Sequence, residues 1–98
     1  MKPPDLVFPE DFEEYAWEIE AKGWFLCPVR VGGRTADVTF YDPARLAQDV
    51  SADHASGVPF AVTRLVVIER VTADRMREAL GLLPENFFAD LTPNQPGS

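Results

Sequence analysis

The sequence predicts one small α/β domain of the α+β class, a two-layer sandwich of helices on a three-stranded mixed sheet with element order α-β-β-α-β-α. Three observations predict it. Two β-rich runs meet at Gly32-Gly33, apolar residues recur at helical spacing elsewhere in the chain, and a long apolar run from Phe60 to Arg70 follows one of the helical segments. With 98 residues the chain forms a single domain over residues 1–98, and we expect flexible ends at 1–4 and 92–98.

The first helix is expected from Pro9 to Lys22. Proline suits the first helical turn, acidic residues cluster near the positive end of the helix dipole, and Gly23 can adopt the left-handed conformation that ends a helix. Four apolar residues recur at helical spacing and predict the buried side of this helix, namely Phe12, Tyr15, Ala16 and Ile19.

A β-hairpin is expected over Trp24 to Tyr41, with Gly32 and Gly33 both at positive φ in the turn. This turn fixes the register, because a slip of one residue would move every side chain to the other face. It pairs Phe25 with Phe40, Cys27 with Val38, and Val29 with Ala36, all on one apolar face that the helices should cover. Pro28 has no backbone N–H to donate away from the hairpin, so we expect its strand at the edge of the sheet.

The second helix is expected from Pro43 to about Asp53, with Asp42 as its N-cap. Its buried side chains are predicted to be Leu46, Ala47 and Val50. Eighteen residues separate Tyr41 from Phe60, enough for a helical crossover, so the strand over 60–70 should run parallel to the second hairpin strand. That strand is apolar on both faces, which is typical of two-sided burial.

The last helix is expected to start at Thr72, with Val71 and Met76 in contact across the cap, and to end at Pro84. Its inward residues are predicted to be Met76, Ala79, Leu80 and Leu83. A final turn over 84–91 carries Phe87, Phe88 and Leu91.

These elements give the sheet order 1-2-3 in chain order, which leaves the strand over 60–70 as an exposed apolar edge. A second chain, the residues Asp5 to Phe8 as a short extra strand, or the Phe87/Phe88 tail would each cover it. We favour a homodimer. The alternative topology is a split β-α-β unit in which the first hairpin strand is central and Pro28 lies at a bulge.

The formal net charge is −7, and residues 1–22 hold two lysines against seven acidic residues, a net of −5. Nucleic acids are polyanions, so the sequence argues against DNA or RNA binding. No apolar run approaches membrane-spanning length, and no secretory leader is recognisable, so we expect a cytoplasmic protein with no membrane association. A single cysteine and one histidine give no zinc-type spacing, and no cofactor is expected.

Trp17 is the first candidate for a binding site. By the helical repeat it lies outside the buried stripe of its helix, among the acidic residues Glu10, Glu13, Glu14 and Glu20. An exposed tryptophan among carboxylates suits an arginine or lysine of a protein partner. In the alternative reading, Leu6 and Phe8 of the N-terminal arm fold over Trp17 and bury it.

A second candidate is the outer face of the hairpin. Trp24, Leu26 and Tyr41 gather at one end of it, and the tail residues Phe87 and Phe88 could pack there. This patch predicts either a docking surface or, with the tail as a second wall, a closed apolar pocket for a small molecule.

Enzymatic chemistry has one weak candidate, the group Asp49, Asp53 and His54 near the end of the second helix. Cys27 lies on the apolar hairpin face, where burial makes a thiol a poor nucleophile. The leading hypothesis is therefore a non-catalytic acidic interaction module that self-associates or neutralises a basic protein, as immunity-type or antitoxin-type inhibitors do. The alternatives are a small-molecule binding domain and an enzyme centred on Asp49, Asp53 and His54.

Overall fold

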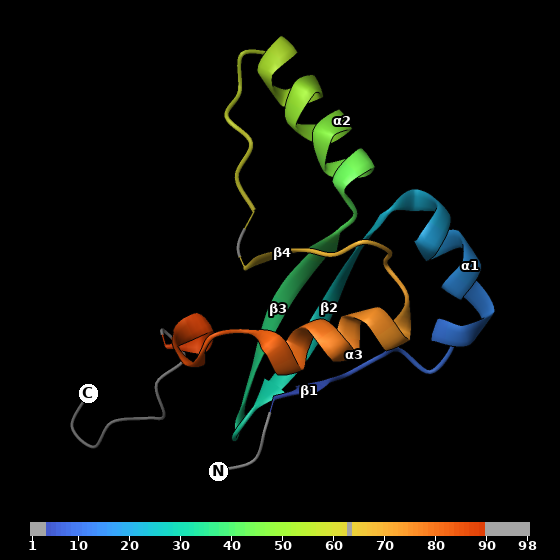
Figure 1. Cartoon of the computed structure of the whole chain (residues 1–98), viewed down its shortest axis with the longest axis vertical. Coiled ribbons are helices and arrows are strands. Elements are labelled where there is room, and N and C mark those ends of the chain that lie inside the picture. The colour runs from blue at the N-terminus through green and yellow to red at the C-terminus, as the bar shows by residue number, and fades with distance from the viewer. Residues whose placement is uncertain (1–3, 63, 90–98) are drawn as a thin grey trace.

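The computed structural model describes residues 4–62 and 64–89 and shows a mixed α/β chain of the α+β class. The described part contains three α-helices and a four-stranded mixed sheet of order β1-β2-β3-β4 (Figure 1). The expectation of flexible ends at 1–4 and 92–98 concerns residues that, apart from Pro4, lie outside this part. The elements are β1 (Asp5–Leu6), α1 (Phe12–Lys22), β2 (Trp24–Val31), β3 (Arg34–Tyr41), α2 (Pro43–Ala55), β4 (Leu65–Val67), α3 (Ala73–Leu82) and a 3-10 helix, η1 (Glu85–Phe88).

The hairpin of β2 and β3 has the register predicted from the glycine pair. Phe25 lies opposite Phe40, Cys27 opposite Val38, and Val29 opposite Ala36. The turn itself differs from the prediction, because only Gly32 adopts positive φ, at 62°, and Gly33 does not. A type II′ turn has this sign pattern, and it still matches the twist of the two strands.

The predicted three-stranded sheet is wrong, because Asp5 and Leu6 form a fourth strand, β1, that pairs antiparallel with β2. The strand with Pro28 is therefore not at the edge, as the absence of a backbone donor had suggested. A proline can still accept a hydrogen bond, and the Val7 N–H donates to the Pro28 carbonyl at 2.9 Å. Because Pro28 has no N–H to donate, the pairing of β1 with β2 is limited to two residues, but it still forms.

Cys27 compensates for the donor that Pro28 lacks. Its thiol donates to the Val7 carbonyl at 3.7 Å, on the side where the Pro28 nitrogen has no hydrogen to offer. The side chain is fully buried, and burial raises the pKa of the thiol to about 11. Cys27 is thus a structural residue of the core, with a weak polar role at the end of β1.

The strand expected over 60–70 is only the three residues of β4, although it does run parallel to β3. Arg64 stands immediately before it at φ 51°, outside the extended region, so the backbone cannot continue as a strand toward Phe60. Two-sided burial is also wrong, since Val66 is buried while Val67 is 46% exposed. Because β4 pairs with β3 and not with β2, the split β-α-β alternative is wrong as well.

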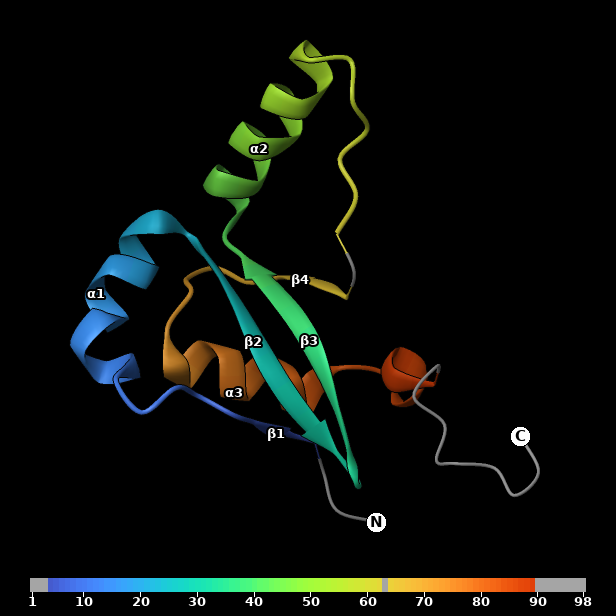
Figure 2. The same cartoon turned by 180° about the vertical axis from the view of Figure 1, so that it is seen from behind.

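The core lies between one face of the sheet and the helices α1 and α3. Cys27, Val29, Val38 and Phe40 pack in one cluster with Phe12 of α1 and with Met76 and Leu80 of α3. Figure 1 shows α3 crossing this face, and Figure 2 shows the opposite face of β2 and β3 without a helix over it. Burying a side chain such as Met76 contributes roughly 1.5–3 kcal/mol, so this cluster is the main source of stability.

The helix starts follow the predicted caps at α2 and α3. Asp42 accepts from the Arg45 N–H at 2.7 Å, and Thr72 accepts from the Arg75 N–H at 3.3 Å. Val71 and Met76 are both fully buried in the core. Helix α1 begins at Phe12, three residues later than predicted. Pro9 does not start the helix but a turn before it, in which the Pro9 carbonyl accepts from the Phe12 N–H.

Two burial predictions for the helices are wrong. Tyr15, assigned to the buried stripe of α1, is 48% exposed, because the stripe that meets the sheet is centred on Phe12, Ala16 and Ile19. Helix α2 buries none of its residues: Leu46 and Val50 are half-buried and Ala47 is exposed. This helix extends past the end of the sheet instead of lying on it (Figures 1 and 2).

Candidate functional site

The candidate site is a groove between α1 and the start of α3, which we call the acidic groove. Its volume is about 580 Å³, and its apolar lining includes Phe8, Phe12, Ala16 and Trp17. The N-terminal arm forms part of it, because the Phe8 ring packs 4.4 Å from the Phe12 ring and Phe12 in turn contacts Phe25 at 5.3 Å. The floor of the groove therefore packs directly against the hydrophobic core.

Trp17 lies in this groove and is 68% exposed. The alternative reading, in which Leu6 and Phe8 cover it, is wrong. Leu6 is buried in the sheet as part of β1, and Phe8 packs on Phe12, five residues before Trp17. A large aromatic side chain is thus left open to solvent beside an apolar floor, as interface anchors are.

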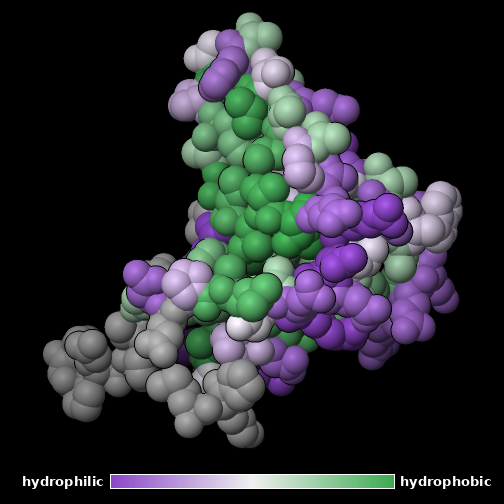
Figure 3. Space-filling model, in the orientation of Figure 1, coloured by the Kyte–Doolittle hydropathy of each residue, from purple (hydrophilic) through white to green (hydrophobic). Residues whose placement is uncertain are grey.

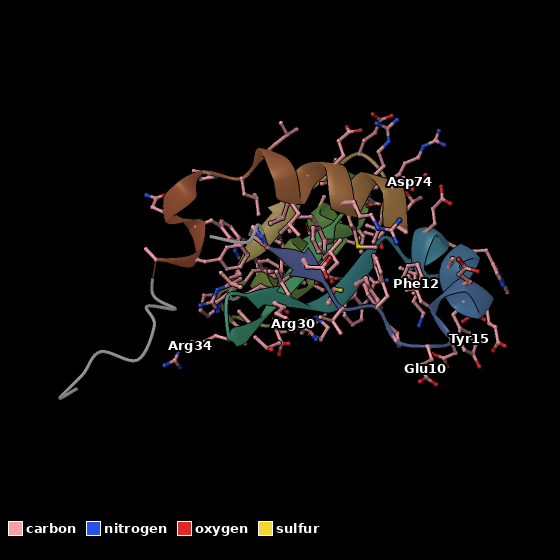
Figure 4. The ribbon with its side chains drawn as sticks, turned by 90° about the horizontal axis from the view of Figure 1, so that it is seen from below. Glu10, Phe12, Tyr15, Arg30, Arg34 and Asp74 are labelled. Atoms are coloured by element: carbon pink, nitrogen blue, oxygen red, sulfur yellow. The ribbon has the colours of Figure 1, made fainter. Side chains whose placement is uncertain are left out.

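Carboxylates from two elements surround this floor. Glu10 lies in the turn before α1, Glu13 and Glu20 lie on α1, and Asp74 comes from the first turn of α3. In Figure 4, Asp74 and Glu10 lie on either side of Phe12. Against these four acidic residues the lining holds one cation, Arg77, so the groove has a net charge of −3. Glu14, also proposed for this site, is exposed on α1 but does not line the groove.

Arg77 shows what kind of group this groove accepts. Its guanidinium carbon lies 5.1 Å from the centre of the Phe8 ring, a cation–π contact, and its Nη1 lies 3.6 Å from Asp74 Oδ1. The sequence did not point to Phe8, Asp74 or Arg77 as site residues. The spacing of Asp74 and Arg77 indicates only a local helical pair, and their position opposite α1 depends on the tertiary fold.

The outer-face patch is only partly assembled. The Trp24 and Tyr41 rings stack at 6.4 Å, and Phe60 adds an edge contact to Tyr41 at 5.9 Å. Phe87 and Phe88 pack against the core cluster on the other face of the sheet, so the structure separates them from Trp24, Leu26 and Tyr41. Beside Leu26 lies an open depression of about 530 Å³, not the closed apolar pocket expected for a small-molecule site.

Asp49 is held in a structural role. It accepts hydrogen bonds from the Tyr41 hydroxyl at 2.6 Å and from Arg45 Nε at 2.9 Å, and the bond from Tyr41 is the main reason that its pKa is lowered. Burial and this same hydrogen bond raise the pKa of Tyr41 to about 12. The pair ties the base of α2 to the end of β3.

The three residues of the enzyme hypothesis do not form one site. The His54 side chain is exposed, and within residues 4–62 and 64–89 no hydrogen bond or ion pair joins it to Asp49 or Asp53. The same described residues contain no group of three or more His, Cys, Asp or Glu side chains placed to hold a metal ion.

Comparison of the chain with protein-family models, with curated proteins and with solved structures gave no match. Among the described residues, no helix combines the length and the apolar character needed to cross a bilayer.

Proposed function

We propose that this protein is a non-catalytic interaction module that binds a basic segment of a protein partner in the acidic groove. The observation that supports it best is Trp17, a 68% exposed tryptophan in a groove whose charged residues sum to −3. Tryptophan carries more binding energy at interfaces than most residues, and surrounding charge accelerates the encounter with an oppositely charged partner.

The chemistry of the preferred ligand follows from Arg77. This residue already places a guanidinium over Phe8 beside a carboxylate, within the same groove. An arginine or lysine from a partner would find the same combination at Trp17, with Glu13 and Glu20 nearby. A basic partner of this kind is what an immunity-type or antitoxin-type inhibitor would neutralise.

The direct test is a titration with a short Arg-rich amphipathic peptide, followed by Trp17 fluorescence in a Trp24→Phe background. The matched control peptide has glutamine in place of arginine. We expect saturable, salt-sensitive binding of the Arg peptide only, because the attraction is between charges at the protein surface. Trp17→Ala, followed by calorimetry, should weaken binding by about 30-fold or more, the loss typical of an interface hot spot.

Two matched pairs of variants separate the groove from the rest of α1. Glu13→Lys reverses a charge in the groove, whereas Glu14→Lys makes the same change on the same helix outside it. Likewise, Trp17→Ala removes the groove aromatic and Tyr15→Ala removes an exposed aromatic outside it. Equal effects within either pair would show that binding depends on the net charge or hydrophobicity of α1 and would refute the proposed site.

A further inference from the structure

Helix α2 is amphipathic, and it is the one α-helix of the described chain that has no buried residue. On its polar side, Asp49 accepts from the Tyr41 hydroxyl at the end of the hairpin, and Arg45 donates to the Lys22 carbonyl at the end of α1. Its apolar side carries Leu46 and Val50, which are only half-buried. A helix of this kind normally owes its stability to burial of the apolar face, and here no element within residues 4–62 and 64–89 completes that burial.

The neighbouring segments continue the same apolar surface. After α2 the chain returns to the sheet through residues 56–62, in which Val58 is 51% exposed and Phe60 is half-buried against Tyr41. Strand β4 adds Leu65 and the 46% exposed Val67. Figure 3 shows a continuous hydrophobic band from α2 down to the middle of the molecule. We call this surface, made of α2, 56–62 and β4, the apolar flank.

A free sheet edge belongs to the apolar flank. In the described chain β4 is the last strand of the sheet. It pairs with β3 through the backbone groups of residues 64, 66 and 68: the Thr39 N–H donates to the Arg64 carbonyl, and the Ile68 N–H donates to the Tyr41 carbonyl. The backbone groups of Leu65 and Val67 alternate to the outer side, where no strand follows. An uncharged edge of this kind is a template for pairing with another strand.

We propose that a second copy of this chain occupies the apolar flank, with the two β4 edges pairing antiparallel across a two-fold axis. An edge strand and the apolar surface beside it can complement their own copies across such an axis, as an isologous interface requires. The charge distribution also permits it. Residues 1–22 carry −5 of the net −7 and include β1, α1 and one side of the acidic groove, whereas the strand at the opposite end of the sheet, β4, carries no charge.

The area supports an interface that includes both α2 and the sheet edge. A helix of 13 residues is about 20 Å long and about 10 Å wide, so α2 presents a face of roughly 200 Å². A stable interface buries about 800 Å² per partner. The rest must come from β4 and the surface around it, so variants in α2 and in β4 should both weaken the dimer.

The test is the oligomeric state of the full chain by sedimentation equilibrium over a range of micromolar concentrations. We expect wild-type dimers, and we expect Val50→Asp and Val67→Arg each to raise the dimer dissociation constant by on the order of 100-fold, because each residue occurs twice in a two-fold interface. Tyr15→Asp introduces the same negative charge as Val50→Asp, but at an exposed residue of α1, and it should leave the dimer dissociation constant unchanged. Circular dichroism confirms that each variant is folded.

A cross-linking experiment keeps the proposal testable if a charged variant fails to fold. Val67→Cys places a thiol at the β4 edge, while the native Cys27 is fully buried. A short bis-maleimide should cross-link Val67→Cys into covalent dimers and leave the Tyr15→Cys control monomeric. A monomeric wild type at these concentrations, or dimers that resist both charged variants, would overturn the proposal and assign the apolar flank to a different partner.

Discussion

Among the five glycines that the structure describes, Gly23→Ala is expected to be the most destabilising addition of a single methyl group. Gly23 ends α1 at φ 81°, a left-handed conformation that costs a residue with a side chain roughly 1–2 kcal/mol. Space is also lacking, since a Cβ built there would lie 2.5 Å from Asp42 Oδ2 and 2.8 Å from Arg45 Cβ. Overpacking of this kind costs about 1–3 kcal/mol.

The clash involves the cap of the next helix as well. Asp42 Oδ1 accepts from the Arg45 N–H, and the Asp42 N–H donates to the Gly23 carbonyl at 2.8 Å, so a shift of Asp42 weakens the start of α2. The sum of strain and overpacking is about 2–5 kcal/mol, a large part of the roughly 5–15 kcal/mol that stabilises a typical domain. Urea unfolding followed by circular dichroism measures this difference directly.

Two other glycines supply the controls. Gly32 has φ 62° but open space around its Cβ position, so Gly32→Ala should cost only the conformational part, about 1–2 kcal/mol. Gly81 lies in α3 with nothing near its Cβ position, so Gly81→Ala should stabilise the protein by up to about 1 kcal/mol. If Gly23→Ala lowers the free energy of unfolding by no more than Gly32→Ala, the α1–β2 and β3–α2 junctions do not lie as close together as described.

Two further predictions concern titratable groups. Tyr41 should titrate near pH 12 in absorbance measurements on a Tyr15→Phe background, and Asp49→Asn should lower that pKa toward 10 without reaching it, because burial is the larger cause of the shift. Since the folded-state pKa is raised, the stabilisation from Tyr41 is complete below about pH 10 and is lost as the pH rises to about 12. Cys27, with its pKa raised to about 11 by burial, should resist a thiol reagent at pH 8 in the folded protein and react fully in denaturant, whereas rapid labelling of the native protein would contradict its place in the core.

The parts of the fold that depend on local rules could be predicted from the sequence. The register of β2 and β3 follows from a short turn and a period of two, and the caps Asp42 and Thr72 satisfy backbone groups within three residues. The class and the parallel β3–β4 pairing follow from alternation of elements and connection length.

The parts that depend on competition between distant segments could not. The sequence allows Asp5 to Phe8 as a short extra strand, but the expected place is beside the strand over 60–70, whereas β1 pairs with β2. A strand of only Asp5 and Leu6 is too short for a periodic signal, and nothing local indicates which strand it joins. Helix α2 has a normal amphipathic pattern, and nothing in that pattern tells whether its apolar side meets the same chain or another molecule.

The candidate site shows the same division. The helical repeat placed Trp17 outside the buried stripe of α1, and its exposure agrees with that placement. Asp74 and Arg77 were missed, because they complete the acidic groove from a helix more than fifty residues later in the chain.

The short strand β1 limits how far this protein can polymerise. Pro28 has no N–H to donate to the arm, and β1 is only two residues long. The edge that β1 offers to a further strand is therefore short, and it carries the charged residue Asp5, two features that disfavour pairing with another chain. Among the described strands β4 is the other edge of the sheet, and the two-fold pairing proposed above would occupy it. An assembly built from such units closes at a pair, so raising the concentration should never produce fibres.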